Sequence, residues 1–172
     1  VTVEAGGRLL PLLFVSPQQI NALVPSDFKA GTYSLSIRAT GQPAVSAEFR
    51  LARNAPGLFA LFLRTDGSLV LPENPARPGE VLTMFGTGFG PLFPAPLDGF
   101  PVPEEPEFLP VDPVILLAGD SLLPAPAVKA AAGFSGLAAV TFQAPDAPPE
   151  AAVRLKVRVN GHESNSVPLP VS

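Results

Sequence analysis

The sequence lacks cysteine and tryptophan, and it has one histidine, one tyrosine and one methionine among 172 residues. Without cysteine, the chain forms neither a disulfide framework nor a thiolate metal site. With His162 as the only histidine, no conventional nucleophile–base pair can be assembled, and no serine lies in a Gly-x-Ser-x-Gly segment. We therefore predict that the protein is not an enzyme and uses no cofactor.

Long apolar runs and a strong charge imbalance are also missing. The longest apolar segments, at 9–15 and 58–63, are far shorter than the ~18–20 residues that span a bilayer. A net charge of −4 gives no general attraction to nucleic acid or to an anionic membrane. No secretory leader is visible and the chain begins at Val1, so we expect a mature protein or an excised piece.

Proline and glycine are abundant, with 23 and 15 copies, while 47% of the residues are hydrophobic. The hydrophobic content argues against disorder. Prolines at this density oppose long helices, because each removes a backbone donor and clashes with the preceding turn. This composition favours an all-β protein with short strands and many turns.

The chain contains an internal repeat. Residues 1–11 match 114–124 at an offset of 113, and residues from Ile20 onward match those from Val140 at an offset of 120. Apolar positions keep their parity through both matches, which indicates two copies of one structural unit.

Each copy is predicted to form strands. Apolar and polar residues alternate at 33–39 and 153–159, a Gly-containing turn follows, and a second alternating run returns at 45–51 and 167–171. We therefore predict two tandem immunoglobulin-like β-sandwich units, at 1–52 and 53–172. The apolar segment 55–63 is expected to be buried on both faces, either at the junction of the units or as the first strand of the second unit. The Pro-rich residues 91–113 are expected to form a long irregular loop.

The segment Gly-Thr-Gly-Phe-Gly at 86–90 invites comparison with a phosphate-binding loop. Such a loop leads into a helix, whereas here Pro91, Pro94 and Pro96 follow and the next lysine is Lys129. The residues before it alternate as a strand does. We interpret the segment as a strand that ends in a glycine turn.

Four motifs carry a resemblance to a known family. They are PLLFVSPQQINALVP at 11–25, APGLF at 55–59, NPARPG at 74–79 and the glycine turn. The strand and turn at 78–91 resemble those of IPT/TIG-type immunoglobulin-like domains. Nearly the whole chain is similar to a C-terminal domain found in secreted proteins of Solibacter and other acidobacteria. The resemblance implies paired immunoglobulin-like units on exported proteins, secreted or at the cell surface, and it implies no activity.

The sequence departs from the family pattern in its first unit. A Pro-Gly–strand–Gly segment is missing there, so the first unit is predicted to lack an N-terminal strand and to leave one sheet edge unpaired. We expect that edge at Val1, Thr2 and Val3, where an upstream segment, a partner or another copy could add a strand. Truncation of the chain is the alternative explanation.

Acidic and basic residues supply the remaining site candidates. Calcium could bind carboxylates of the 91–113 loop, namely Glu104, Glu105, Glu107 and Asp112, although a solvated acidic loop is the simpler interpretation. One face of a predicted strand carries Arg154, Lys156 and Arg158, and Arg38 is the repeat partner of Arg158. This stripe could contact an acidic partner, or it could be a charged solvent face that resists edge pairing.

The function predicted from the sequence is a non-catalytic extracellular interaction or spacer module of a larger exported protein. One alternative is a subunit that self-assembles into an oligomer or fibre by strand addition at the open edge. Carbohydrate binding is a weaker alternative, because tryptophan is absent, one tyrosine is present and phenylalanine offers no polar handle. The expected partner is a protein or a second copy.

Overall fold

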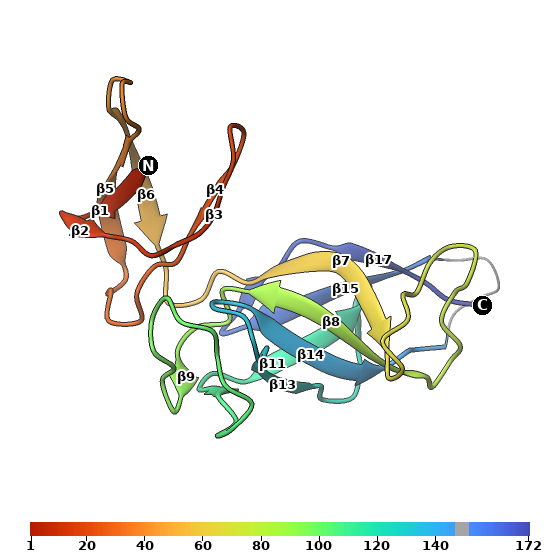
Figure 1. Ribbon diagram of the computed structural model, residues 1–172. Helices are drawn as coiled ribbons and strands as arrows, with labels where there is room; N and C mark the ends of the chain where they lie inside the picture. The colour runs from red at the N-terminus through yellow and green to blue at the C-terminus, as the bar shows by residue number, and fades with distance from the viewer. Residues whose placement is uncertain (147–151) are drawn as a thin grey trace.

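The computed structural model describes residues 1–146 and 152–172, and within these residues every regular element is a β-strand (Figure 1). The predicted all-β class is confirmed. All pairings between the strands are antiparallel. Among the described residues, no helix is long and apolar enough to cross a membrane.

The first unit, residues 1–52, contains one four-stranded sheet and one two-stranded ribbon. The sheet has the order β2-β1-β5-β6, and the ribbon pairs β3 with β4. These strands are β1 (Thr2–Ala5), β2 (Arg8–Leu9), β3 (Leu12–Val15), β4 (Ile20–Ala22), β5 (Gly31–Arg38) and β6 (Val45–Leu51). Leu12, Ile20 and Ala22 of the ribbon pack against the apolar cluster of the sheet, and sheet and ribbon lie to one side of the second unit (Figure 1).

The second unit, residues 53–172, packs two sheets around one core. One sheet has the order β13-β14-β8-β7, and the other has the order β12-β11-β15-β16, with β17 also paired to β15. The strands of the first of these sheets are β7 (Gly57–Arg64), β8 (Val81–Thr87), β13 (Ala127–Ala130) and β14 (Ala138–Gln143). Those of the second are β11 (Val114–Ala118), β12 (Ser121–Leu122), β15 (Ala152–Val159), β16 (His162–Glu163) and β17 (Val167–Pro170). Leu82, Met84 and Val140 of one sheet pack in the same buried cluster as Leu155 and Leu169 of the other.

The repeat found in the sequence is reproduced in strand pairing. Thr2 pairs with Arg38 as Ile115 pairs with Arg158, so the two pairings differ by the sequence offsets of 113 and 120. Backbone bonds outside the strands repeat as well: the N–H of Leu10 donates to Val3 O, and that of Leu123 donates to Leu116 O. The two units therefore share one hydrogen-bond register, set by the same apolar alternation.

The strand pair β7–β8 has no counterpart in the first unit. In the second unit, β14 lies between β13 and β8, whereas β4, its equivalent, pairs only with β3 among the described residues. The sequence predicted one missing strand, and the structure shows that the first unit lacks the equivalents of two.

Two expectations about the second unit need correction. The strand β7 is not buried on both faces: Leu58 and Phe62 are buried, but Phe59 is 51% and Leu61 is 42% exposed. It is an edge strand with an irregular register, so only one of its faces meets the core. Residues 91–113 are not irregular throughout, because β9 (Leu92–Phe93) pairs with β10 (Leu109–Pro110) as a short ribbon.

The predicted open edge at the start of the chain is partly paired. Strand β1 pairs with β5 from Thr2 to Ala5, and on its other side β2 pairs with Glu4 and Ala5. The side chain of Val3 is buried, with 4% exposed, and its carbonyl accepts from Leu10. Val1 precedes the strand and is 51% exposed. A role of Val1, Thr2 and Val3 in interaction stays a prediction.

Candidate interaction surface

The glycine turn at 86–90 holds the segment that joins the two units. The N–H of Ala55 donates to Gly88 O at 2.9 Å, and a Cβ at Gly88 would lie 2.0 Å from the carbonyl oxygen of Ala55. Both Gly88 and Gly90 have positive φ, of 75° and 95°. Glycine is required here by backbone conformation and by close packing of the joining segment, which agrees with a strand and turn.

A polar cluster fixes the same junction. Asn54 is 2% exposed, and its Nδ2 donates to Phe89 O and to Asp112 Oδ2, each at 3.0 Å. Asn160 Nδ2 donates to Asn54 Oδ1 at 3.0 Å, and Arg53 Nε donates to Asp112 Oδ2 at 2.9 Å. The hydrogen bonds from Arg53 and then Asn54 lower the pKa of Asp112 to about 2. Asp112 is thus a structural anion at the junction.

The loop at 91–113 reaches the first unit. Asp98 accepts from the N–H of Ser26 at 3.1 Å and 3.0 Å and from its hydroxyl at 3.1 Å. A groove of about 860 Å³ lies beside this contact, lined by residues of both units that include Ala22, Phe28, Phe89 and Leu97. The groove begins where β4 ends.

The β3–β4 ribbon presents three consecutive exposed apolar residues of the first unit. Leu13, Phe14 and Val15 are 44%, 50% and 45% exposed. No charged residue occurs between Arg8 and Asp27. Edge strands are usually protected by charge, proline or a covering element, and strand β4 has none of these.

The core beneath the ribbon is incompletely covered. Leu35, Ile37 and Phe49 are partly buried, although their repeat partners Leu155, Val157 and Leu169 are each 0% exposed. In the second unit, side chains of β7 and β8 complete the buried cluster. The first unit lacks that strand pair, so its apolar inner face remains accessible.

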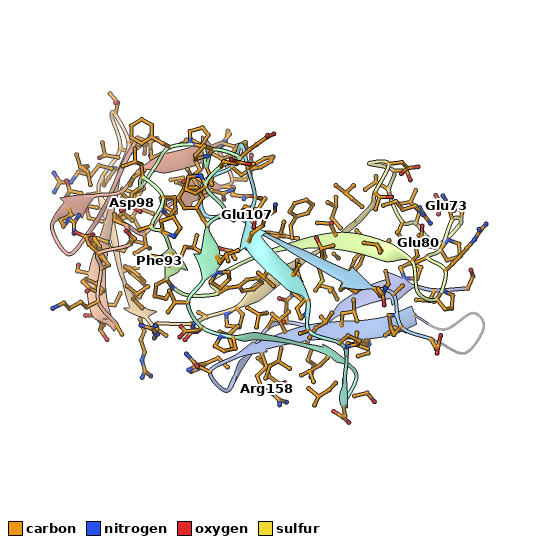
Figure 2. The ribbon with its side chains drawn as sticks, turned by 90° about the horizontal axis from the view of Figure 1, so that it is seen from below. Glu73, Glu80, Phe93, Asp98, Glu107 and Arg158 are labelled. Carbon is orange, nitrogen blue, oxygen red and sulfur yellow. The ribbon has the colours of Figure 1, made fainter. Side chains whose placement is uncertain are left out.

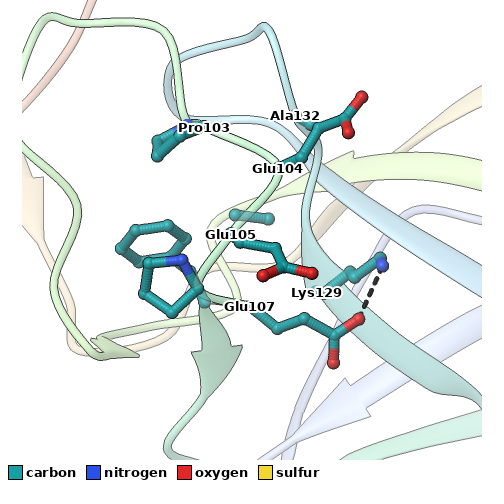
Figure 3. A pocket seen from close by; sticks show the side chains of 9 residues that line it. Pro103, Glu104, Glu105, Glu107, Lys129 and Ala132 are labelled. Atoms are coloured by element: carbon teal, nitrogen blue, oxygen red, sulfur yellow. Dashed lines mark hydrogen bonds and ion pairs between the residues drawn. The ribbon is translucent and has the colours of Figure 1, made fainter.

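The calcium candidates are not brought together as ligands. Glu107 pairs with Lys129 at 2.7 Å and Asp112 pairs with Arg53, while Glu104 and Glu105 are exposed. In Figure 3, Glu107 points to Lys129 and Glu104 projects in another direction. In the described ranges, no group of three or more His, Cys, Asp or Glu side chains is placed to hold a metal ion.

The basic stripe lies on the exposed face of β15, as the alternation predicts. Arg158 Nε donates to Glu163 Oε1 at 3.1 Å and Lys156 Nζ donates to Glu163 Oε2 at 3.4 Å, and these bonds lower the pKa of Glu163. Arg154 lies on the same strand, opposite Pro168, and Arg38 lies on β5 of the first unit. Figure 2 shows Arg158 well apart from Glu107.

Among the described residues, neither Tyr33 nor His162 forms a further candidate binding site. Tyr33 packs between Phe28 and Phe49, with ring centroids 5.1 Å and 5.8 Å away, and its hydroxyl donates to Lys29 O at 2.8 Å. It is half-buried, and its ring lies between two phenylalanine rings. His162 is exposed beside the Asn160–Gly161 turn, as expected.

The site missed by sequence reasoning is the edge of β4. The sequence repeat indicated it, because the repeat aligns Ile20–Ala22 with Val140–Phe142 of β14, a strand paired on both sides by β13 and β8. No protein-family model and no curated protein matches this sequence.

Proposed function

We propose that this chain is a non-catalytic interaction module of a larger exported protein, and that its first unit binds a protein partner. One observation carries the proposal: the first unit repeats the strand register of the second but leaves its inner apolar face and the β3–β4 ribbon accessible. The equivalent surface of the second unit is buried. If another polypeptide covers this surface in the first unit, the surface is a binding site.

The strand order supports the immunoglobulin-like part of this proposal. In the second unit, β7-β8-β14-β13 faces a sheet built on β11, β15 and β17, which corresponds to the ABED and CFG sheets of an immunoglobulin sandwich. The first unit keeps the equivalents of the C, D, E, F and G strands. A secreted or cell-surface location follows from the family resemblance, and fold alone assigns no ligand.

Hydrogen bonds hold the junction between the units, which suits a module that presents its partner in a defined direction. Asn54, Asp112 and the glycine turn restrain the joining segment, and Ser26 binds the 91–113 loop. The second unit is therefore proposed to act as a rigid base for the first.

Selection from a displayed peptide library against the whole chain tests this function. We expect enriched peptides with alternating apolar residues, whose binding weakens in the Phe14→Ser variant. Phe59→Ser is the matched control, because Phe14 and Phe59 are 50% and 51% exposed but lie on different units. No enrichment, or equal effects of the two variants, would contradict binding through the first unit.

Self-assembly is the second candidate, favoured by the uncharged edge of β4. Light scattering over a concentration series separates the two. A monomer at every concentration supports a module for a different partner, and a mass that rises with concentration supports self-assembly.

A further inference from the structure

We propose that Asn160 is a deamidation site that acts as a one-way switch of the junction between the two units. While the junction is closed, the side-chain amide of Asn160 is held by Asn54 and stays intact. Once the joining segment at 53–55 moves away, the amide is lost as ammonia, and the carboxylate left at position 160 prevents the junction from closing as before. This covalent change lies in the second unit and is independent of what the first unit binds.

Asn160 is the one asparagine of the chain that precedes a glycine. An asparagine loses its amide when the backbone nitrogen of the next residue attacks the side-chain carbonyl carbon, Cγ. A side chain on that next residue hinders the attack, so the reaction is fastest when the next residue is glycine. The remaining asparagines precede alanine, alanine, proline and serine; they are Asn21, Asn54, Asn74 and Asn165. Asn160 is also exposed to the water that the reaction consumes.

The reaction balances with water as the only co-reactant. The backbone nitrogen of Gly161 forms a bond to Asn160 Cγ, the bond from Cγ to Nδ2 breaks, and Nδ2 leaves as ammonia with the proton from Gly161. The product is a cyclic succinimide. Water then opens the ring at either carbonyl and gives aspartate or isoaspartate at position 160. Both products exchange a neutral amide, which donates hydrogen bonds, for a carboxylate, which only accepts them.

The closed junction restrains the side chain that reacts. Asn160 and Gly161 form the two-residue turn between β15 and β16, and their φ values of 47° and 79° are those of a type I′ turn. The Nδ2 of Asn160 donates to Asn54 Oδ1 at 3.0 Å. Attack requires the side chain to rotate until Cγ meets the nitrogen of Gly161, and the bond to Asn54 must break before this rotation.

Asn54 holds Asn160 from a fixed position. Its side chain is 2% exposed, and its Nδ2 donates to Phe89 O and to Asp112 Oδ2, each at 3.0 Å. A Cβ at Gly90 would lie 2.4 Å from that Nδ2, so the backbone of the glycine turn packs directly against the amide. Motion of the joining segment carries Asn54 away and frees Asn160, which couples the chemical reaction to local opening of the junction.

The reacted side chain cannot restore the polar cluster. A carboxylate at position 160 brings no donor to Asn54 Oδ1, which is buried and accepts from Asn160 alone among the described residues. If the Asn54 amide turns over to donate to that carboxylate, it gives up its bonds to Phe89 O and Asp112. The pKa of Asp112 is lowered by hydrogen bonds from Arg53 first, and then from both asparagines of the cluster. A carboxylate at position 160 therefore repels Asp112 where the amide attracted it.

The sequence repeat supplies an internal control. Thr40 and Gly41 are the repeat partners of Asn160 and Gly161, and they lie in the β5–β6 hairpin, whose tip points away from the second unit (Figure 1). The Thr40→Asn variant therefore carries two Asn–Gly turns, of which only one is held by Asn54. The folded variant is incubated at mildly alkaline pH, and peptide mass spectrometry follows aspartate and isoaspartate at both positions. We expect position 40 to react about tenfold faster, because no bond to a buried partner restrains it.

Adding Asn54→Ala to this variant tests the hydrogen bond itself. The reaction at position 160 should become about tenfold faster, while the rate at position 40 stays the same. An acceleration at both positions would mean that the substitution unfolds the chain, and the comparison within the Thr40→Asn variant then decides. Equal rates at the two positions of that variant would overturn protection by Asn54. An Asn160 that stays intact in the folded Asn54→Ala chain would overturn the assignment as a deamidation site.

The Asn160→Asp variant imitates one product and tests the effect on the junction. The N–H of Ala55 donates to Gly88 O across the junction, and the N–H of Val70 donates to Phe62 O near the other end of β7. Hydrogen exchange followed by NMR should be about tenfold faster at Ala55 than in the unchanged protein, because a buried acceptor has lost its donor. Exchange at Val70 should stay the same. Unchanged exchange at Ala55 would overturn the switch, since the carboxylate would then leave the junction closed.

Discussion

The two units of this protein share a strand register and differ in how completely the apolar inner face of their sheets is covered. In the second unit, Leu155, Val157 and Leu169 are fully buried between two sheets. Their repeat partners in the first unit are only partly buried, because no equivalent of β7–β8 lies over them. The comparison teaches that the same alternating strands produce a closed core or an accessible surface according to whether a second sheet is complete.

The largest expected effect is a difference in stability loss between two residues at equivalent repeat positions, Leu155 and Leu35. Leu155→Ala should lower the free energy of unfolding by about 2–5 kcal/mol, as large-to-small changes in closed cores do. Leu35→Ala should cost less than half of that, since Leu35 is already partly exposed. Urea unfolding measures both, with circular dichroism for the whole chain and the fluorescence of Tyr33, the only tyrosine, for the first unit. Equal losses would show that the first unit is as closed as the second.

A smaller effect is expected at the junction between the units. Gly88→Ala should cost roughly 3 kcal/mol, because it adds a clash with Ala55 O to the strain of positive φ. Gly79→Ala is the matched control: φ is 77° there and a Cβ would meet nothing within 4 Å. Its cost should be about 1 kcal/mol. Thermal unfolding compares the two, and similar losses would mean that the joining segment is not held by the turn.

The smallest effect concerns acid stability at the junction. The pKa of Asp112 is lowered to about 2 by its bonds to Arg53 and Asn54, whereas an aspartate in an unfolded chain has a pKa of about 3.9. The folded state therefore gains stability from this group above pH ~4 and loses it as the pH falls towards 2. Asp112→Asn should flatten that part of the pH dependence. Unfolding by urea at pH 5 and at pH 2.5 provides the measurement, and an unchanged slope would exclude Asp112 as its source.

Sequence alone determined the all-β class, the repeat and most strands, because period-2 alternation and Gly or Pro turns are local signals. It placed β5, β6, β15 and β17 to within about two residues, an accuracy usual for strand ends. It also separated the glycine turn from a phosphate loop, since the prolines after it exclude a helix.

Tertiary structure decided which edges are paired and which faces are covered. The pairing of β1 with both β2 and β5, the exposed face of β7 and the open edge of β4 depend on contacts between residues far apart in the chain. An alternating segment has the same pattern whether a neighbour lies beside it or not. The alternation therefore determines which side chains face inward. Only the packing of the sheets determines whether a second sheet lies against those side chains.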